Sequence, residues 1–120
     1  MVNQGDIIQL NFNPQTGHEQ SGRRPALVIS NGDFSRITKV AAMVCPITRT
    51  DKRLPFHINL DDRTQTSGVV LCDQAKIIDI NARNYEFVEK APQDVVLEAI
   101  DIIKGFIEIE AETNKNSQNS

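Results

Sequence analysis

The chain has 120 residues, of which 39% are hydrophobic and 24% are charged, and its formal net charge is −3. This length predicts one domain with a single core, and the composition is typical of a folded globular protein, which excludes a disordered chain. No apolar run reaches membrane-spanning length and the N-terminus lacks the features of a secretory signal, so we expect a cytoplasmic protein.

The first predicted element is a half-buried strand over residues 6–12. Ile8, Leu10 and Phe12 alternate with polar residues, which places them on one face of that strand. The chain then turns over 13–17 and enters the polar stretch Gly-His-Glu-Gln-Ser-Gly-Arg-Arg-Pro over 17–25. These side chains are costly to bury without partners, so the stretch indicates a functional loop. Because Pro25 favours an extended Arg24, we expect the loop to deliver Arg24 to the start of a strand over 26–29.

Four further short strands are predicted, over 40–47, 56–60, 68–72 and 75–78. The sequence Ser-Asn-Gly-Asp over 30–33 indicates a break, and a loop with basic residues follows the strand over 40–47. His57 alternates with apolar neighbours, so we expect it on the solvent face of its strand.

The C-terminal part of the domain has the periodicity of a helix. Pro92 and Asp94 suit a first helical turn, and apolar residues recur every three or four positions after it, which predicts an amphipathic helix over roughly 92–109. The fold class we expect is therefore mainly β (α+β): a small, strongly curved sheet or barrel capped by the C-terminal helix. We expect residues 1–110 to form the domain and the polar stretch 111–120 to be a disordered tail.

Charge is divided unevenly along the chain. Residues 20–53 hold seven basic and two acidic side chains, whereas residues 86–120 hold eight acidic and three basic ones. A basic front can bind a polyanion locally while the protein stays acidic overall. Cys45 and Cys72 lie in apolar surroundings without a second Cys or a His nearby, so we expect two buried free thiols.

The motifs of several enzyme classes are missing from the sequence. Its His and Cys residues do not have metal-ligand spacing, and it contains neither a Gly-x-Ser-x-Gly elbow nor a phosphate-binding glycine loop. Arginine, hydroxyl, carboxylate and imidazole groups at strand ends remain. This inventory suits metal-free cleavage of RNA by its own 2′-hydroxyl, because the protein then needs only to move protons and stabilise phosphoryl charge.

Several segments, read in order, resemble the MazF/PemK family of toxin endoribonucleases. The segments are Gly5 to Ile8, Asn13-Pro14, Gly17 to Pro25, Pro46 to Thr48, Pro55-Phe56 and Gly68 to Gln74. The resemblance implies an SH3-like β-barrel with a C-terminal helix, assembled as a homodimer. It also implies sequence-specific cleavage of single-stranded RNA (mRNA) without a metal or cofactor, leaving 2′,3′-cyclic phosphate and 5′-hydroxyl ends. A cognate antitoxin protein would restrain this activity, and DNA would be reached only through the antitoxin.

The resemblance assigns roles to particular residues. Arg24 and Thr48 match the family's catalytic arginine and threonine, and Glu19 matches an acidic residue that assists them. Since the pKa of arginine lies above ~12, we expect Arg24 to stabilise charge and Glu19, or His18 beside it, to be the base. The residues expected to bind RNA or transfer protons are His18, Gln20, Arg23, Arg49, Asp73 and Gln74.

The chain departs from the family pattern at two positions. Arg49 stands where a second hydroxyl residue often follows the catalytic threonine, and Leu71 stands where the PemK branch has an arginine. Outside the resemblance, Arg24 has a second interpretation as a structural arginine at a strand end, and Thr48 as a turn cap.

Two other functional classes are weighed against the ribonuclease. A gyrase-binding poison of the CcdB type has the same architecture but depends on a C-terminal tryptophan, and this chain has no Trp. An SH3-like peptide-binding module needs exposed aromatic residues. The five Phe and one Tyr are expected mostly at inward strand positions, where they would make a poor recognition surface.

Overall fold

The computed structural model of the chain describes residues 1–13, 17, 21–50 and 54–111. Its strands are β1 (Asp6–Asn11), β2 (Arg23–Val28), β3 (Ala41–Thr48), β4 (His57–Asn59), β5 (Val69–Leu71), β6 (Lys76–Asp79) and β7 (Glu86–Lys90). Its helices are α1 (Gly32–Thr38) and α2 (Gln93–Ile107), with 3-10 turns η1 (Cys72–Gln74) and η2 (Asn81–Arg83). No helix in these described ranges is long and apolar enough to span a bilayer.

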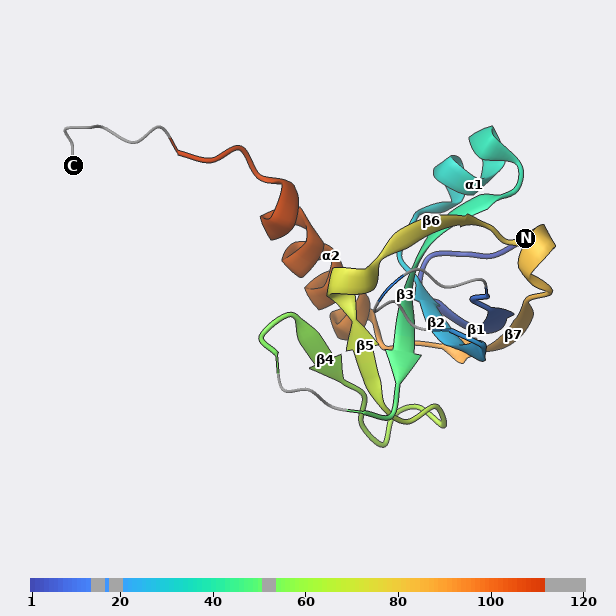
Figure 1. Cartoon of the computed structure of the whole chain (residues 1–120), viewed down its shortest axis with the longest axis horizontal. Helices are drawn as coiled ribbons and strands as arrows, with labels where there is room; N and C mark the ends of the chain where they lie inside the picture. The colour runs from blue at the N-terminus through green and yellow to red at the C-terminus, as the bar shows by residue number, and fades with distance from the viewer. Residues whose placement is uncertain (14–16, 18–20, 51–53, 112–120) are drawn as a thin grey trace.

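The strands form an antiparallel sheet in the order β4-β5-β3-β2-β1-β7, with β6 also paired to β3 (Figure 1). β3 is the centre of this arrangement. One edge of β3 pairs with β2, while its other edge pairs first with β6 and then, near its C-terminal end, with β5. The turn η1 separates β5 from β6, so a single edge of β3 serves two consecutive strands.

Alternation along the strands divides the core between the two faces of the sheet. On β1, Ile8 and Leu10, together with Phe12 just beyond the strand, belong to one buried cluster, as their spacing predicts. Ile7 belongs to the other cluster, which α2 covers through Val95, Val96 and Ala99. The helix thus covers one face of the sheet, and its C-terminal turns extend beyond the sheet (Figure 1).

The expected fold class is confirmed, with an open path of strands in place of a closed barrel. In the part of the chain that the structure describes, β4 and β7 end the path without pairing to each other. The predicted helix is present, two residues shorter at its end, and the strands predicted near 6–12, 26–29, 40–47, 56–60, 68–72 and 75–78 are all found.

Two elements differ from the sequence prediction. The segment Ser-Asn-Gly-Asp was expected only to break the chain, but Asn31 caps α1 by accepting a hydrogen bond from Phe34 N at 3.0 Å. Strand β7 has no buried face: Phe87 and Val88 are 60% and 39% exposed, so its burial does not alternate and only its pairing with β1 defines it.

Exposed aromatic residues correct a further expectation. Phe87 and Phe106 are 60% and 50% exposed, so these two aromatic side chains do not point inward. Ile107, near the end of the predicted helix, is 77% exposed, since the C-terminal turns of α2 extend beyond the sheet (Figure 1). The predicted tail over 111–120 lies, after Ala111, outside the described residues.

Candidate functional site

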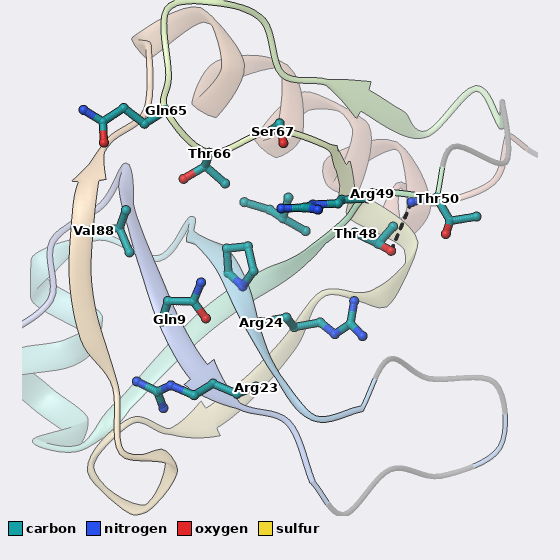
Figure 2. Close-up of a pocket in the computed structure, with 12 residues that line it drawn as sticks. Gln9, Arg23, Arg24, Thr48, Arg49, Thr50, Gln65, Thr66, Ser67 and Val88 are labelled. Atoms are coloured by element: carbon teal, nitrogen blue, oxygen red, sulfur yellow. Dashed lines mark hydrogen bonds between the residues drawn. The ribbon is translucent and has the colours of Figure 1, made fainter.

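A cavity of about 470 Å³ opens where β2 and β3 meet the segment between β4 and β5 (Figure 2). Its polar lining consists of three arginines, four hydroxyl residues and two glutamines, namely Arg23, Arg24, Arg49, Thr48, Thr50, Thr66, Ser67, Gln9 and Gln65. Pro25, Ile47 and Val88 complete it. The cavity therefore combines cationic and hydroxyl groups over a small apolar floor.

The pairing of β2 with β3 brings Arg24 and Thr48 together. The antiparallel register aligns Ala26 with Pro46, and the same register carried two residues further places Arg24 opposite Thr48. Arg24 is the second residue of β2 and Thr48 is the last residue of β3, so both side chains lie at one end of the sheet. Residues 24 apart in sequence thus share one cavity (Figure 2).

Arg24 is half-buried at the base of the polar loop. Its Nε donates to the carbonyl oxygen of Ser21 at 2.9 Å, which orients the guanidinium. The loop base is closed by Gly22, whose N–H donates to Asn13 Oδ1 at 2.9 Å and whose carbonyl accepts from Phe12 N at 2.9 Å. Gly22 has a φ of +76°, a conformation that favours glycine.

Thr48 is buried, with only 8% of its surface exposed. Its Oγ1 accepts a hydrogen bond from Thr50 N at 3.3 Å (Figure 2). That bond does not use the hydroxyl proton, so Thr48 keeps the capacity to donate to a ligand in the cavity.

The electrostatics of the cavity favour an anion. Among its described lining residues there are three guanidinium groups and no carboxylate. Arg23 Nη2 pairs with Glu86 at 2.5 Å on β7, and its Nη1 donates to the carbonyl of Asn84 at 2.8 Å. Arginine offers permanently charged, multidentate donors that match phosphate geometry. The site is chemically suited to hold a phosphodiester.

The structure brings some of the sequence-predicted residues to the cavity and leaves others elsewhere. Arg23, Arg24, Thr48 and Arg49 line it. His18, Glu19 and Gln20 lie outside the described residues. Asp73 and Gln74, expected to bind RNA or transfer protons, are on η1 and do not line the cavity.

Asp73 instead contacts His57. The His57 Nε2 to Asp73 Oδ1 distance is 3.1 Å, and the His57 side chain is only 4% exposed. The expectation that His57 faces solvent was wrong, because η1 folds over the end of β4 and the Phe56 ring packs against the imidazole edge-on at 5.3 Å. In the described ranges, no three His, Cys, Asp or Glu side chains lie close enough to hold a metal ion.

Sequence reasoning missed the wall formed by Gln65, Thr66 and Ser67. These residues belong to a polar, threonine-rich stretch between two predicted strands, and that composition was the available signal. Gln9 lines the cavity and was also missed. The available signal was its position on the polar face of the first predicted strand.

The two cysteines are buried free thiols, as predicted. Contact with the Cys72 thiol, burial and nearby negative charge all raise the pKa of Cys45 far above its ordinary value. Cys45 is therefore an unreactive core residue at neutral pH.

Comparison with known proteins places this arrangement in context. Residues 3–107 match the family described as the PemK-like, MazF-like toxin of type II toxin-antitoxin systems. The chain is 33% identical over 103 residues to the Escherichia coli endoribonuclease PemK, covering 82% of this chain and 77% of that protein.

Solved structures of MazF proteins are also similar to this chain. A crystal structure of MazF from Deinococcus radiodurans superposes with a TM-score of 0.83 at 38% identity, covering 88% of this chain and 96% of that one. A MazE–MazF structure from the same organism gives a TM-score of 0.77 at 38% identity, with 88% and 95% coverage.

Proposed function

This chain belongs to the PemK-like, MazF-like toxin family of type II toxin-antitoxin systems, and on that premise we propose that it is a sequence-specific endoribonuclease acting on single-stranded RNA. The observation that carries the proposal is the convergence of Arg24 and Thr48 in a cavity whose described lining has three guanidinium groups and no carboxylate. Such a lining attracts a phosphodiester and can stabilise added charge on its phosphoryl oxygens.

The proposed reaction needs no metal, because the substrate supplies its own nucleophile. The 2′-oxygen attacks the adjacent phosphorus, and the bond from phosphorus to the 5′-oxygen breaks. One proton leaves the 2′-hydroxyl and one reaches the 5′-oxygen, giving a 2′,3′-cyclic phosphate and a 5′-hydroxyl. Negative charge on the two non-bridging phosphoryl oxygens is greatest after the 2′-oxygen has attacked and before the bond to the 5′-oxygen has broken.

Each described group has a role that suits its surroundings. Arg24, oriented by its bond to Ser21, stabilises the phosphoryl charge and can supply a proton to the leaving oxygen. Thr48 donates its hydroxyl proton to a phosphoryl oxygen, since its oxygen already accepts from Thr50 N. Arg49 holds a neighbouring phosphate, and Arg23, which is already paired with Glu86, adds a further RNA contact. This division separates charge stabilisation from proton removal.

Proton removal is assigned to the polar loop. Glu19, or His18 beside it, has the pKa range of a general base, which arginine lacks. Gln20 completes the RNA contacts of that loop. Asp73 and Gln74 lie on η1, away from the cavity. They would contact only the part of the RNA strand that continues beyond the site of cleavage.

The proposed partners follow from the charge of the cavity. A cognate antitoxin would present an acidic segment that competes with RNA for the arginines. We also propose that the protein is cytoplasmic, since the proposed mRNA substrate is found in that compartment. The family resemblance further leads us to propose a homodimer. The gyrase-poison alternative is not retained, because the relatives matched here are named as endoribonucleases.

The test compares Arg24→Ala with Arg36→Ala. Arg36 is an exposed arginine on α1 that pairs with Asp33 and does not line the cavity, so it controls for loss of charge alone. Single-turnover cleavage of RNA should fall at least ~100-fold in Arg24→Ala and stay at the wild-type rate in Arg36→Ala. Wild-type cleavage by a folded Arg24→Ala protein would rule out the proposed site.

A further inference from the structure

The segment 61–67 between β4 and β5 forms one wall of the cavity. Figure 2 shows Gln65, Thr66 and Ser67 along the side of the cavity opposite Arg23 and Arg24. The segment has no helix or strand of its own, and Gln65 and Ser67 are exposed. Its position must therefore come from contacts with other elements.

The principal contact is the carboxylate of Glu89 on β7. Its Oε1 accepts from Gln65 N at 3.0 Å, and its Oε2 accepts from both Thr66 N and Thr66 Oγ1 at 2.7 Å. Burial alone would raise the pKa of Glu89, but the hydrogen bonds from Thr66 and Gln65 outweigh it and hold the pKa below its usual value. Glu89 is thus an ionised clamp at neutral pH, and charge-assisted bonds of this kind are strong.

Two more contacts hold the segment on either side of residues 65–67. Arg63 donates from both terminal nitrogens to Asp94 at the start of α2, at 2.8 and 3.0 Å. At the other end, a Cβ on Gly68 would lie 2.4 Å from the carbonyl oxygen of Thr48, so the segment returns directly against the backbone of the proposed catalytic threonine. The wall is therefore held at a set position relative to Thr48.

The contact with Glu89 also determines which hydrogen-bonding groups of residues 65–67 remain available to a ligand. The N–H groups of Gln65 and Thr66 are engaged by Glu89, and so is the hydroxyl proton of Thr66. A hydroxyl whose proton is committed can only accept from a further partner. Thr66 lines the cavity, and its hydroxyl oxygen can only accept, which matches a donor on RNA such as the amino group of a base or a 2′-hydroxyl.

We propose that Glu89 is a positioning residue for RNA recognition, which holds the wall 65–67 against the cavity and fixes Thr66 as a hydrogen-bond acceptor. This inference rests on the proposed ribonuclease function. It assigns selectivity to a side chain that does not itself line the cavity. Glu89 acts on substrate binding and leaves the charge-stabilising groups Arg24 and Thr48 in place.

The experiment uses Glu89→Gln, Thr66→Val and the double variant, with Glu98→Gln as the matched control. Glu98 is exposed on α2 and away from the cavity. Steady-state cleavage of an RNA oligonucleotide should show a KM raised at least fivefold in Glu89→Gln, with kcat changed less than twofold. Thr66→Val should show the same change, and the double variant no further change, because both variants remove one interaction.

Two readouts separate positioning from general destabilisation. Cut-site mapping on a mixed RNA should show the same relaxed sequence preference in Glu89→Gln and Thr66→Val. Amide hydrogen exchange at Gln65 and Thr66 should be at least tenfold faster in Glu89→Gln than in the wild type, with the core strands unchanged.

The outcomes distinguish this inference from the proposed function. A wild-type protein that cuts no RNA contradicts the function itself. Cleavage by the wild type, together with an unchanged KM and cut-site pattern in a folded Glu89→Gln variant, overturns the inference alone. Fully additive effects in the double variant overturn it as well, since they would show that Glu89 and Thr66 act independently.

Discussion

At the scale of single residues, the pair Arg24 and Thr48 depends on strand register. Each lies two positions beyond the aligned residues Ala26 and Pro46, on opposite strands. A one-residue slip would turn one of the two side chains to the other face of the sheet. The register is secured by the buried neighbours Leu27 and Cys45, which are fully inaccessible to solvent.

Thr48→Val tests the hydroxyl without changing the shape of the side chain. We expect single-turnover RNA cleavage to fall about 100-fold, because one donor to the phosphoryl oxygen is lost. The free energy of unfolding should fall by only about 1 kcal/mol, because Thr50 N loses its acceptor. The control is Thr38→Val, which removes a hydroxyl on α1 away from the cavity, and this variant should cut RNA at the wild-type rate. A fully active Thr48→Val protein would remove Thr48 from the mechanism.

Gly68→Ala tests the close approach of the wall to Thr48. Gly68 has a φ of +127°, and an added Cβ would lie 2.4 Å from the Thr48 carbonyl oxygen. We expect a loss of at least about 2 kcal/mol in the free energy of unfolding, measured with urea. At Gly32 nothing lies within 4 Å of an added Cβ and φ is not positive, so Gly32→Ala should be close to neutral. Equal effects at both glycines would argue against the close approach.

At the scale of elements, α2 is anchored by its first half. Val96 is 7% exposed and belongs to the core, whereas Leu97 is 60% exposed. We expect Val96→Ala to lower the free energy of unfolding by about 2 kcal/mol and Leu97→Ala to change it by less than about 0.5 kcal/mol. Urea denaturation of both variants provides the measurement. An equal loss at both positions would contradict the packing of α2 described here.

The clamp on the segment 61–67 makes a prediction for acid stability. Because hydrogen bonds hold the pKa of Glu89 below its usual value, its contribution is present above the ordinary glutamate pKa and is lost as pH falls through the folded-state value. The stability difference between wild type and Glu89→Gln should therefore be present near pH ~7 and shrink towards pH ~3. Urea midpoints across this range measure it, and a difference independent of pH would contradict the ionised clamp.

Sequence reasoning recovered the elements whose apolar residues alternate or repeat. It found the strand over 6–12 because Ile8, Leu10 and Phe12 bury one face, and the C-terminal helix because its stripe packs on the sheet. It missed α1, whose seven residues begin in a stretch that also suits a turn, and β7, whose side chains are largely exposed. Local periodicity carries no information about an edge strand defined only by its partner.

The candidate site was recovered in part for similar reasons. Arg23, Arg24, Thr48 and Arg49 were named from the polar loop and the family resemblance, and they do share the cavity. The contact of Glu89 with the segment 65–67 was not foreseeable, because its hydrogen bonds join residues 23 and 24 apart in sequence. The pairing of Asp73 with a buried His57 likewise depends on how η1 folds over β4.

At the scale of the whole molecule, charge is divided between the cavity and the C-terminal part of the sequence. The cavity gathers three arginines, whereas the last 35 residues carry eight acidic side chains against three basic ones. The overall charge of −3 then limits non-specific binding, while the local field favours a polyanion at one place.

Salt dependence measures this local field. A 2′-deoxy oligonucleotide lacks the nucleophile, so its binding can be followed by fluorescence anisotropy without cleavage. We expect the slope of log affinity against log salt to become shallower by about 0.7 in Arg49→Gln, the effect of one phosphate contact on a single strand. Arg36→Gln should leave the slope unchanged. An unchanged slope in Arg49→Gln would exclude a phosphate contact at Arg49.

The most direct test of the proposed mechanism is to map the ends left on a mixed RNA incubated with the protein in EDTA. We predict cleavage at a restricted set of sequences, with 2′,3′-cyclic phosphate and 5′-hydroxyl ends, and no cleavage by Arg24→Ala under the same conditions. Cleavage that requires added metal, or that leaves 5′-phosphate ends, would contradict the reaction proposed for Arg24 and Thr48.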